Sequence, residues 1–531
     1  MKLFKTSLLF WLLTFTLFKG IVWAGIVPLW HFPDEQAHFA QVQNYAEFGK
    51  KHYWDEQGTT SQEIAISEEL LGTLRNKQGR NRFTHHPEYN LFYTDGFIGK
   101  DEEEIKSFPQ EFRKEMAINE ATSYPPLYYF LASRFYLLVK PFNFFIRVFT
   151  TRLFSVLTTV ATVWLVYKIG RLVFEKKTLA AALGVLVSFQ PMFAFVGSGV
   201  SSDTLFNFFF TLFIYASLLV FEKASFKALL YLILSIVGGL LTKQQMAVAL
   251  LLLPFVLGVS FYKKLKARRR KFFSKKTIVI LLAVFLLILA GLKYGEIKVI
   301  AGFIKAGKDS TLKDLNLVDH LIWTLRHTIA EVLPWYWGVF KWLGVVLPRW
   351  ANRVQMRILA LAVLGLLIWP VKIIRRRRTE KKDWQVGFLA LASIAYLMAV
   401  TLWDWQFRKA YGFSFGIQGR YFFPAISAHM ALILFGLTQL IPKKLKKWLV
   451  FLLFVWWAIL LHIGLCTVLK SYYQLWPLNT LWFQLSQYKP FWFKAQWWFL
   501  WTGLYVLSLL ALITKLSLCI VKEKAVKTKV I

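Results

Sequence analysis

Long hydrophobic runs, separated by short polar stretches, make up most of the chain. A helix of roughly 20 apolar residues is long enough to cross the hydrocarbon core of a bilayer. The pattern therefore predicts an all-α polytopic membrane protein with twelve spans. Their expected ranges are residues 7–28, 148–167, 178–198, 204–221, 226–242, 245–262, 277–294, 355–374, 385–402, 421–441, 448–469 and 497–519.

Two neighbouring stretches near the N-terminus interrupt this regular alternation. Residues 29–122 are mostly polar and contain amphipathic segments, which predict juxtamembrane helices in a long first outer loop. Residues 127–139 are apolar but too few to cross a bilayer, and Arg134 lies in their middle. We expect this second segment to lie along the membrane interface.

The basic residues fix the expected orientation. The 531-residue chain is 56% hydrophobic and carries a net charge of +36. Its Lys and Arg residues gather in short clusters between spans, as at 263–271 and 375–378, which is typical of cytoplasmic loops and argues against nucleic-acid binding. Both termini are then expected in the cytoplasm of this multi-pass cell-membrane protein. The expected outer segments are 29–147, 295–354, 403–420 and 470–496.

A short charged stretch directly follows the first span. In Pro33-Asp34-Glu35-Gln36-Ala37-His38, the proline suits the first position of a helix, and His38 lies four residues after Asp34 on the same face. Asp34, Glu35 and His38 are therefore candidate acid–base groups. Carboxylates also stabilise a helix N-terminus, so the pattern alone favours catalysis and capping about equally.

Three further charged residues are expected at the same membrane surface. Asp203 precedes the span at 204–221, where it could cap a helix or support a site. Lys243 lies between two spans on the outer side, against the usual charge trend, and could bind a phosphate or extend toward lipid headgroups. Arg420 opens the span at 421–441, where it could hold a phosphate bidentately or anchor the helix at the interface.

Several other outer residues are candidates for contact with a substrate. Their side chains are aromatic, and so able to stack on sugars or form an interfacial belt, or they are charged and close to such aromatic residues. They are Tyr124, Arg326, His327, Glu331 and Trp337.

The order of these stretches resembles the glycosyltransferase-C (GT-C) superfamily. The resemblance is carried by Pro33-Asp34-Glu35-x-x-His38, Tyr124-Pro125-Pro126-Leu127, Arg152, Asp203, Trp337 to Gly344 and Gln418-Gly419-Arg420-Tyr421-x-x-Pro424. The pattern is most similar to a bacterial membrane family with a Pro-Asp-Glu-x-x-His signature, and also to protein O-mannosyltransferase-like and ArnT-like enzymes. One departure is Phe32, which stands where that family usually has a second proline.

This resemblance implies a GT-C fold and a membrane glycosyltransferase. The implied enzyme moves a hexose or pentose from a polyprenyl-phosphate donor to a glycan, lipid or protein acceptor on the outer face, with inversion. Asp34 matches the general base, Glu35 and His38 its supports, and Arg420 and Lys243 the donor-phosphate ligands. Some relatives use a divalent metal, Mg²⁺ or Mn²⁺, for which Asp203 or Glu35 is the candidate ligand.

The resemblance also divides the chain and leaves alternatives. Residues 1–442 form the expected catalytic module, and residues 443–531 the C-terminal spans with a basic cytoplasmic tail. A lipid-linked glycan polymerase or ligase would use similar outer loops. A transporter or flippase is the non-enzymatic alternative, although such proteins usually carry ionisable residues within their spans. The spans of this sequence carry few such residues, Lys19 and His462 being the clearest exceptions, and this scarcity weakens the transporter alternative.

Overall fold

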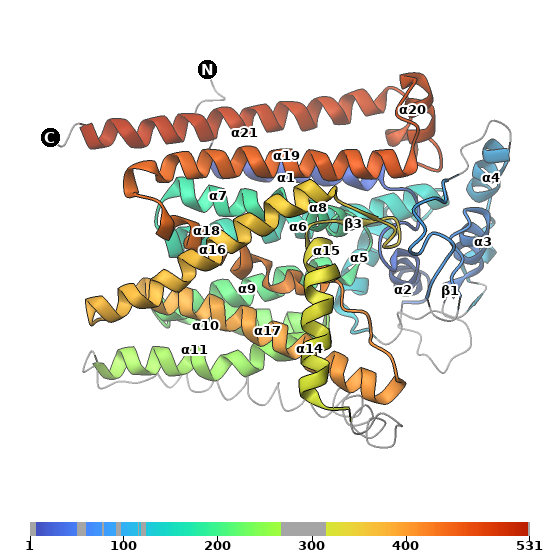
Figure 1. Cartoon of the computed structure of the whole chain (residues 1–531). Coiled ribbons are helices and arrows are strands. Elements are labelled where there is room, and N and C mark those ends of the chain that lie inside the picture. The colour runs from blue at the N-terminus through green and yellow to red at the C-terminus, as the bar shows by residue number, and fades with distance from the viewer. Residues whose placement is uncertain are drawn as a thin grey trace.

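The protein is a bundle of long helices with a group of short helices at one end (Figure 1). The computed structural model describes residues 7–49, 60–76, 79–91, 97–114, 116–117, 124–266 and 315–528. Over these ranges it is almost entirely helical, which confirms the all-α membrane class. The expected span at 277–294 lies outside the described residues.

Eight helical segments within the described ranges are long and apolar enough to cross a membrane. They comprise α1 (Leu8–Ile26), α6 (Phe144–Phe174), α9 (Ser202–Glu222), α16 (Arg349–Arg376), α17 (Lys381–Tyr411), η7 (Gly419–Ala425) continuing into α18 (Ile426–Leu440), α19 (Lys446–Tyr472) and α21 (Trp497–Thr528). Shorter apolar helices occupy the other expected spans: α7 (Lys177–Ser188) with α8 (Pro191–Val196), α10 (Phe226–Leu240), and η4 (Gln244–Met246) with α11 (Ala247–Lys266). Each expected span within the described ranges therefore coincides with a helix.

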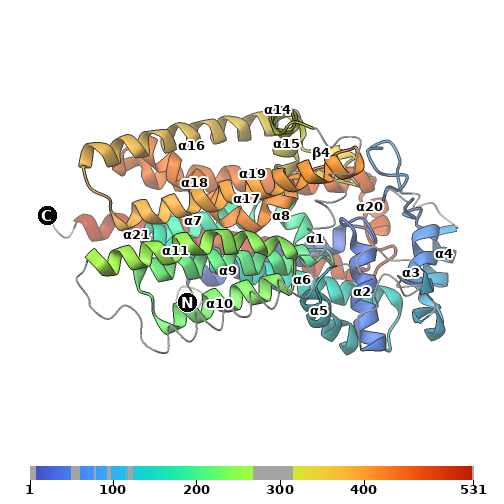
Figure 2. The same ribbon diagram turned by 90° about the horizontal axis from the view of Figure 1, so that it is seen from below.

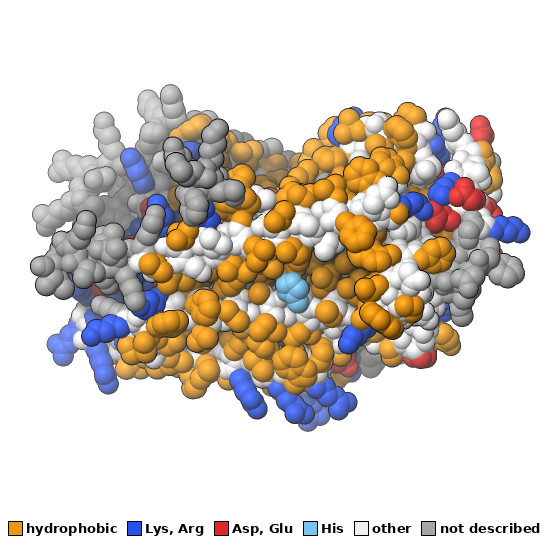
Figure 3. Space-filling model, turned by 90° about the horizontal axis from the view of Figure 1, so that it is seen from above, with side chains coloured by type: hydrophobic (Ala, Val, Ile, Leu, Met, Phe, Trp, Pro, Cys, Tyr) orange, Lys and Arg blue, Asp and Glu red, His pale blue; other side chains and the backbone are white. Residues whose placement is uncertain are grey.

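Side-chain caps set the starts of several of these helices. Ser7, Asn143 and Ser225 each accept a hydrogen bond from a backbone N–H three residues on, which satisfies one of the free donors of a helix start. Exposed hydrophobic side chains cover much of the bundle surface, and Figure 3 shows one such face with Lys and Arg side chains toward its edges. Such a surface suits contact with lipid tails.

The short helices follow α1 and gather at one end of the bundle (Figure 2). The first group contains α2 (Glu35–Phe48), β1 (Thr60–Ser61), α3 (Gln62–Leu70), α4 (Phe97–Lys106), η2 (Gln110–Arg113), β2 (Met116–Ala117) and α5 (Leu127–Leu138). In this group β1 pairs antiparallel with β2, with Thr60 opposite Ala117. Helix α5 has 12 residues, too few to span a membrane, and it packs against α2.

Two further groups of short elements complete the structure. One contains α14 (Leu317–His327), the π-helical turn η6 (Thr328–Val332), α15 (Leu333–Trp337), and the antiparallel pair β3 (Val339–Phe340) and β4 (Val345–Val346). The other contains η8 (Lys443–Leu445), α20 (Leu478–Leu485) and η9 (Phe491–Phe493). Helices α19 and α21 pack beside α1, so the C-terminal segment is in contact with the first span.

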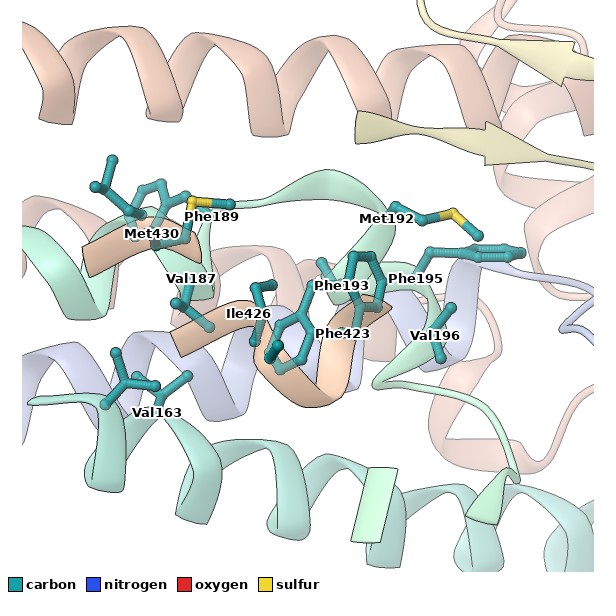
Figure 4. Close-up of a cluster of buried hydrophobic side chains, with 14 of the residues drawn as sticks. Val163, Val187, Phe189, Met192, Phe193, Phe195, Val196, Phe423, Ile426 and Met430 are labelled. Carbon is teal, nitrogen blue, oxygen red and sulfur yellow. The ribbon is translucent and has the colours of Figure 1, made fainter. Parts of the chain in front are cut away.

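A buried aromatic cluster fixes η7 against the centre of the bundle. Phe193 of α8 and Phe423 of η7 meet edge to face, with ring centroids 5.6 Å apart (Figure 4). Both side chains are at most 2% exposed. This packing places the residues just before Phe423, including Arg420, at the junction of the bundle with its short helices.

Two glycines let α16 and α18 pack with their backbones in contact. A Cβ atom at Gly365 would lie 1.9 Å from the carbonyl oxygen of Gly436. Small residues at such crossings are the usual means by which membrane helices approach closely. Because α18 continues directly from η7, this crossing also helps to place Arg420.

We expect Gly365→Ala to lower the free energy of unfolding by about 2 kcal/mol, because the added methyl group meets backbone that cannot move aside. The measurement is thermal unfolding of the purified protein in detergent. Gly503→Ala on α21 is the matched control, since a methyl group added there would meet no atom within 4 Å. Equal melting temperatures for the two variants would contradict the packing described.

Candidate active site

Four charged side chains form a row of alternating sign where η7 and α9 meet the short helices. Arg420 lies between two carboxylates: its Nη2 is 2.9 Å from Oδ2 of Asp34, and its Nη1 is 3.7 Å from Oδ2 of Asp203. Lys243 then donates a hydrogen bond to the other oxygen of Asp203. The structure therefore brings together four candidates that are far apart in the sequence, Asp34 and Arg420 by 386 positions.

Asp34 is held in an unusual backbone conformation directly before α2. Its φ is +55°, in the left-handed region that non-glycine residues seldom adopt, and its side chain makes no hydrogen bond to the helix start. The carboxylate points instead to Arg420, while 45% of the side chain remains exposed. Asp34 therefore does not cap α2 through its side chain, and its carboxylate is directed to Arg420.

The row controls the ionisation of its members. The surrounding protein would raise the pKa of Asp34, but the charge and hydrogen bond of Arg420 outweigh this and lower the pKa to about 2. Burial would lower the pKa of Lys243, yet the nearby carboxylate of Asp203 raises it above its ordinary value. Both side chains are therefore charged at neutral pH.

Arg420 and Lys243 are each oriented by a second contact. The side-chain oxygen of Gln418 accepts a hydrogen bond from Nε of Arg420 at 2.9 Å. The ammonium group of Lys243 lies 5.0 Å from the ring centroid of Tyr124, in a cation–π contact. Only 7% of the Arg420 side chain and 11% of the Lys243 side chain are exposed, so neither extends outward to lipid headgroups.

His38 lies beside this row with a buried imidazole. Its Nδ1 and the hydroxyl of Tyr129 share a hydrogen bond of 2.8 Å, and its ring is 5.7 Å from that of Tyr124. Burial lowers the pKa of His38 to about 4, with Lys243 contributing in the same direction. The ring is therefore neutral at physiological pH and fills the wall of the site.

Glu35 faces away from the row, into a buried ion pair with Arg152. The guanidinium donates to both oxygens of Glu35, at 2.8 and 2.6 Å, and both side chains are fully buried. The backbone N–H groups of Trp30 and Val200 also donate to this carboxylate. Both oxygens of Glu35 are thus occupied by donors of the protein itself. Glu35 therefore has a structural role here, in contrast to the acid–base role that the sequence pattern predicts.

Arg152 uses its remaining donors on the end of the first span. It donates to the backbone carbonyl oxygens of Ala24 and Val27 at the C-terminus of α1, which the helix itself leaves without partners, and to that of Pro28 just beyond it. The pair therefore ties together the end of α1, the start of α2, the first half of α6 and the turn before α9. Asp34 directly precedes Glu35, and Asp203 lies three residues after Val200. Both carboxylates of the row are therefore close to backbone that the pair holds in place.

The remaining candidates from the second outer region make no direct contact with the row among the interactions described. Nε2 of His327 donates to the carbonyl oxygen of Ile417 at 3.1 Å, three residues before Arg420. Arg326 and Glu331 are exposed, and Glu331 lies 3.6 Å from the other ring nitrogen of His327. Trp337 is 3% exposed and packs edge to face on Trp457, so it contributes to the core in place of the expected contact with a substrate.

The carboxylates do not form a donor set suited to Mg²⁺ or Mn²⁺. Such ions are bound by several oxygen ligands, chiefly carboxylates, carbonyls and water. Here Glu35 is taken up by Arg152, and Asp203 lies between Lys243 and Arg420. Within the described ranges, no group of three or more His, Cys, Asp or Glu side chains is placed to hold a metal.

Sequence patterns missed two residues that shape the site. Gln418, which orients Arg420, lies two residues before it in the Gln-Gly-Arg-Tyr stretch. This short separation is the sequence signal that could have identified the contact. Tyr129, the partner of His38, follows the Pro-Pro pair, but nothing in the local pattern links it to a residue 91 positions earlier.

The neighbouring carboxylates Asp34 and Glu35 should differ sharply in their effect on stability. Glu35→Gln leaves the Arg152 charge buried without its partner, which should cost about 3–5 kcal/mol. Asp34→Asn changes a carboxylate that is 45% exposed and leaves Arg420 beside Asp203, so it should cost less, about 1 kcal/mol. Thermal unfolding in detergent measures both variants, and similar losses for the two would contradict the assignment of Glu35 to the framework.

His38 should make the stability of the protein depend on pH below neutrality. Its pKa falls from 6.5 to about 4 on folding, so the unfolded chain binds a proton over this range that the folded chain does not. Stability is therefore fully present above pH 6.5 and declines toward pH 4, by about 2 kcal/mol at pH 5. His38→Gln should lose less stability than the wild type between pH 7.5 and pH 5 in thermal unfolding. His86→Gln, at an exposed histidine, should follow the wild-type profile, and a His38→Gln profile that also does so would refute this origin.

Comparisons with known proteins give one family match and several solved structures of low sequence identity. A search of curated proteins finds no match. The chain is 14% identical to the archaeal oligosaccharyltransferase AglB from Archaeoglobus fulgidus in complex with an inhibitory peptide and a dolichol-phosphate, with a TM-score of 0.42 over 87% of this chain and 56% of that one. The apo form of the Archaeoglobus fulgidus oligosaccharyltransferase is also 14% identical, with a TM-score of 0.42 over 92% and 57% of the two chains. The chain thus matches little more than half the length of these enzymes.

The family assignment comes from a sequence profile. The profile described as "Predicted membrane protein (DUF2142)" matches residues 17–428. This range contains all four members of the charged row, the Glu35–Arg152 pair and Gln418. The chain therefore belongs to the DUF2142 family of membrane proteins.

Proposed function

We propose that this chain is an integral membrane glycosyltransferase that takes a sugar from a polyprenyl-phosphate donor. The observation that carries the proposal is the contact between Asp34 and Arg420 at 2.9 Å, at one end of a membrane bundle. A transfer of this kind needs a base for the acceptor hydroxyl next to a cation for the leaving phosphate. The GT-C resemblance of the motifs that carry these residues agrees with this reading.

In the proposed reaction, Asp34 accepts the proton of an acceptor hydroxyl. The acceptor oxygen forms a bond to the anomeric carbon as the bond from that carbon to the phosphate oxygen breaks. The leaving polyprenyl phosphate takes the bonding electron pair, and the configuration at the anomeric carbon inverts. The partial exposure of Asp34 leaves room for an acceptor beside its carboxylate.

Arg420 and Lys243 serve the leaving group. Together they supply two positive charges, which match the charge that develops on a phosphate as the glycosidic bond breaks. In the free protein these charges are shared with Asp34 and Asp203. A donor phosphate that draws Arg420 toward itself weakens the contact with Asp34, and the pKa of Asp34 then rises from about 2 toward a value better suited to a base.

The site is expected on the extracytoplasmic face, because the basic clusters lie at the other end of the bundle. Arg375 and Arg376 are the last residues of α16, at the end remote from β4, and Arg377 and Arg378 follow them directly. Lys446 and Lys447 are the first residues of α19. The opposite end of α19 reaches the site region, where Tyr472 packs on His31 with ring centroids 4.9 Å apart. By the positive-inside rule, the basic end is cytoplasmic. The acceptor is then a glycan, lipid or protein of the cell envelope.

The proposal predicts that Asp34→Asn abolishes sugar transfer. Loss of a positioned base typically lowers a rate by about 10²- to 10⁴-fold. The assay incubates the purified protein with polyprenyl-monophosphate donors carrying radiolabelled hexoses or pentoses and an envelope extract as acceptor, and measures label in the acceptor fraction. Asp319→Asn, at an exposed carboxylate on α14, is the matched control and should retain wild-type activity.

Two outcomes of this assay would reject parts of the proposal. Full activity in Asp34→Asn would remove Asp34 as the base. Transfer from diphosphate-linked oligosaccharides, with none from monophosphate donors, would assign the chain to the polymerase or ligase alternative.

A further inference from the structure

A buried carboxylate outside the proposed reaction organises the loop that leads to Arg420. Asp404 lies in the last two turns of α17 and is 1% exposed. The hydroxyl of Ser414 donates to its two oxygens at 2.9 and 3.0 Å, and the backbone N–H of Phe415 donates at 2.7 Å. The chain after α17 therefore folds back onto its own helix through this one side chain.

The first part of this loop contains two glycines, which give its backbone access to conformations that other residues seldom adopt. Gly412 and Gly416 flank the tied residues, and both have φ near +80°, which glycine adopts without strain. Ser414 also accepts a hydrogen bond from the N–H of Gly416 at 3.1 Å. Without the Asp404 carboxylate, the Phe415 N–H and the Ser414 hydroxyl lose their partner.

Helix α14 supports the same arrangement from a second side. Nε2 of His320 lies 3.8 Å from Asp404 and 3.2 Å from the carbonyl oxygen of Thr401. His327, two turns further along, donates to the carbonyl oxygen of Ile417. The loop is thus held at Ser414 and Phe415 by α17, and at Ile417 by α14.

From Ile417 the chain passes into Arg420 with little freedom left. A Cβ atom at Gly419 would lie 2.2 Å from the backbone nitrogen of Tyr336, so the loop backbone is pressed against α15. The side chain of Gln418 then holds Nε of Arg420. The path of residues 414–419 decides where the guanidinium lies relative to Asp34.

We propose that Asp404 is a positioning residue that holds Arg420 in place for the donor phosphate, through its hydrogen bonds to Ser414 and Phe415. This inference rests on the proposed function, in which Arg420 binds that phosphate. Loss of the Asp404 carboxylate frees the glycine-flanked loop. Arg420 then spends part of its time away from the site, and the phosphate loses one of its two cations for that time.

The test measures binding of polyprenyl monophosphate to the full-length protein in detergent. We expect Asp404→Ala to raise the Kd by about tenfold, and Asp404→Asn, which keeps an oxygen for the Phe415 N–H, to raise it less. Asp383→Ala is the matched control: this carboxylate is also buried, lies at the other end of α17, and accepts hydrogen bonds from Trp369 and Arg376. It should leave the Kd unchanged. If Asp404→Ala does not yield folded protein, Asp404→Asn is compared with Asp383→Asn.

A double variant separates positioning from general damage. If Asp404 acts through Arg420, then Asp404→Ala should not weaken binding further in an Arg420→Ala background. A full additional loss in that background, or equal losses for the Asp404 and Asp383 variants, would overturn the positioning role while leaving the phosphate site intact. An unchanged Kd in Arg420→Ala alone would instead reject the phosphate site of the proposed function, and the inference with it.

Discussion

The buried ion pair between Glu35 and Arg152 is the contact on which the site depends. It joins the end of the first span, the start of α2, the first half of α6 and the turn before α9 at one point. Removing two charges from water costs several kcal/mol each, and their mutual attraction repays this only when geometry and hydrogen bonds are good. Here the carboxylate has four donors and the guanidinium has three further carbonyl acceptors. We infer that the main effect of the pair is to fix the local backbone. Asp34 and Asp203 are both attached to backbone segments that the pair holds in place.

The charged row projects from the backbone that this pair holds, and its two cations, Arg420 and Lys243, are the groups suited to an anion. Asp34, Arg420, Asp203 and Lys243 alternate in sign, so the free protein keeps its cations compensated at a poorly hydrated position. A phosphate group offers the cations a stronger partner than a carboxylate shared between them. In the proposed reaction, the same exchange releases Asp34 from Arg420, so that binding of the donor and activation of the base are linked through one guanidinium.

The sequence predicted the local features of this protein well and the distant contacts poorly. Hydropathy located the helices because membrane insertion depends on composition over a short window, and the shortness of 127–139 correctly separated α5 from the spans. The position of Asp34 just after the first span could likewise be predicted from the local sequence. The pairing of Glu35 with Arg152 could not, since the two residues are 117 positions apart and other basic residues were equally available. Trp337 was ambiguous for a physical reason, because aromatic rings suit a sugar, a membrane interface and a core alike. The role inferred for Asp404 depends on a loop conformation set by two glycines, which periodicity does not report.

We propose that Arg420 and Lys243 hold a lipid-linked phosphate beside Asp34. The most direct measurement is an experimental structure of the purified protein with polyprenyl monophosphate bound. We expect the phosphate to contact both cations, the Asp34–Arg420 contact to lengthen, and the lipid tail to leave along the surface of the bundle. A phosphate bound elsewhere, with the charged row unchanged, would contradict this proposal.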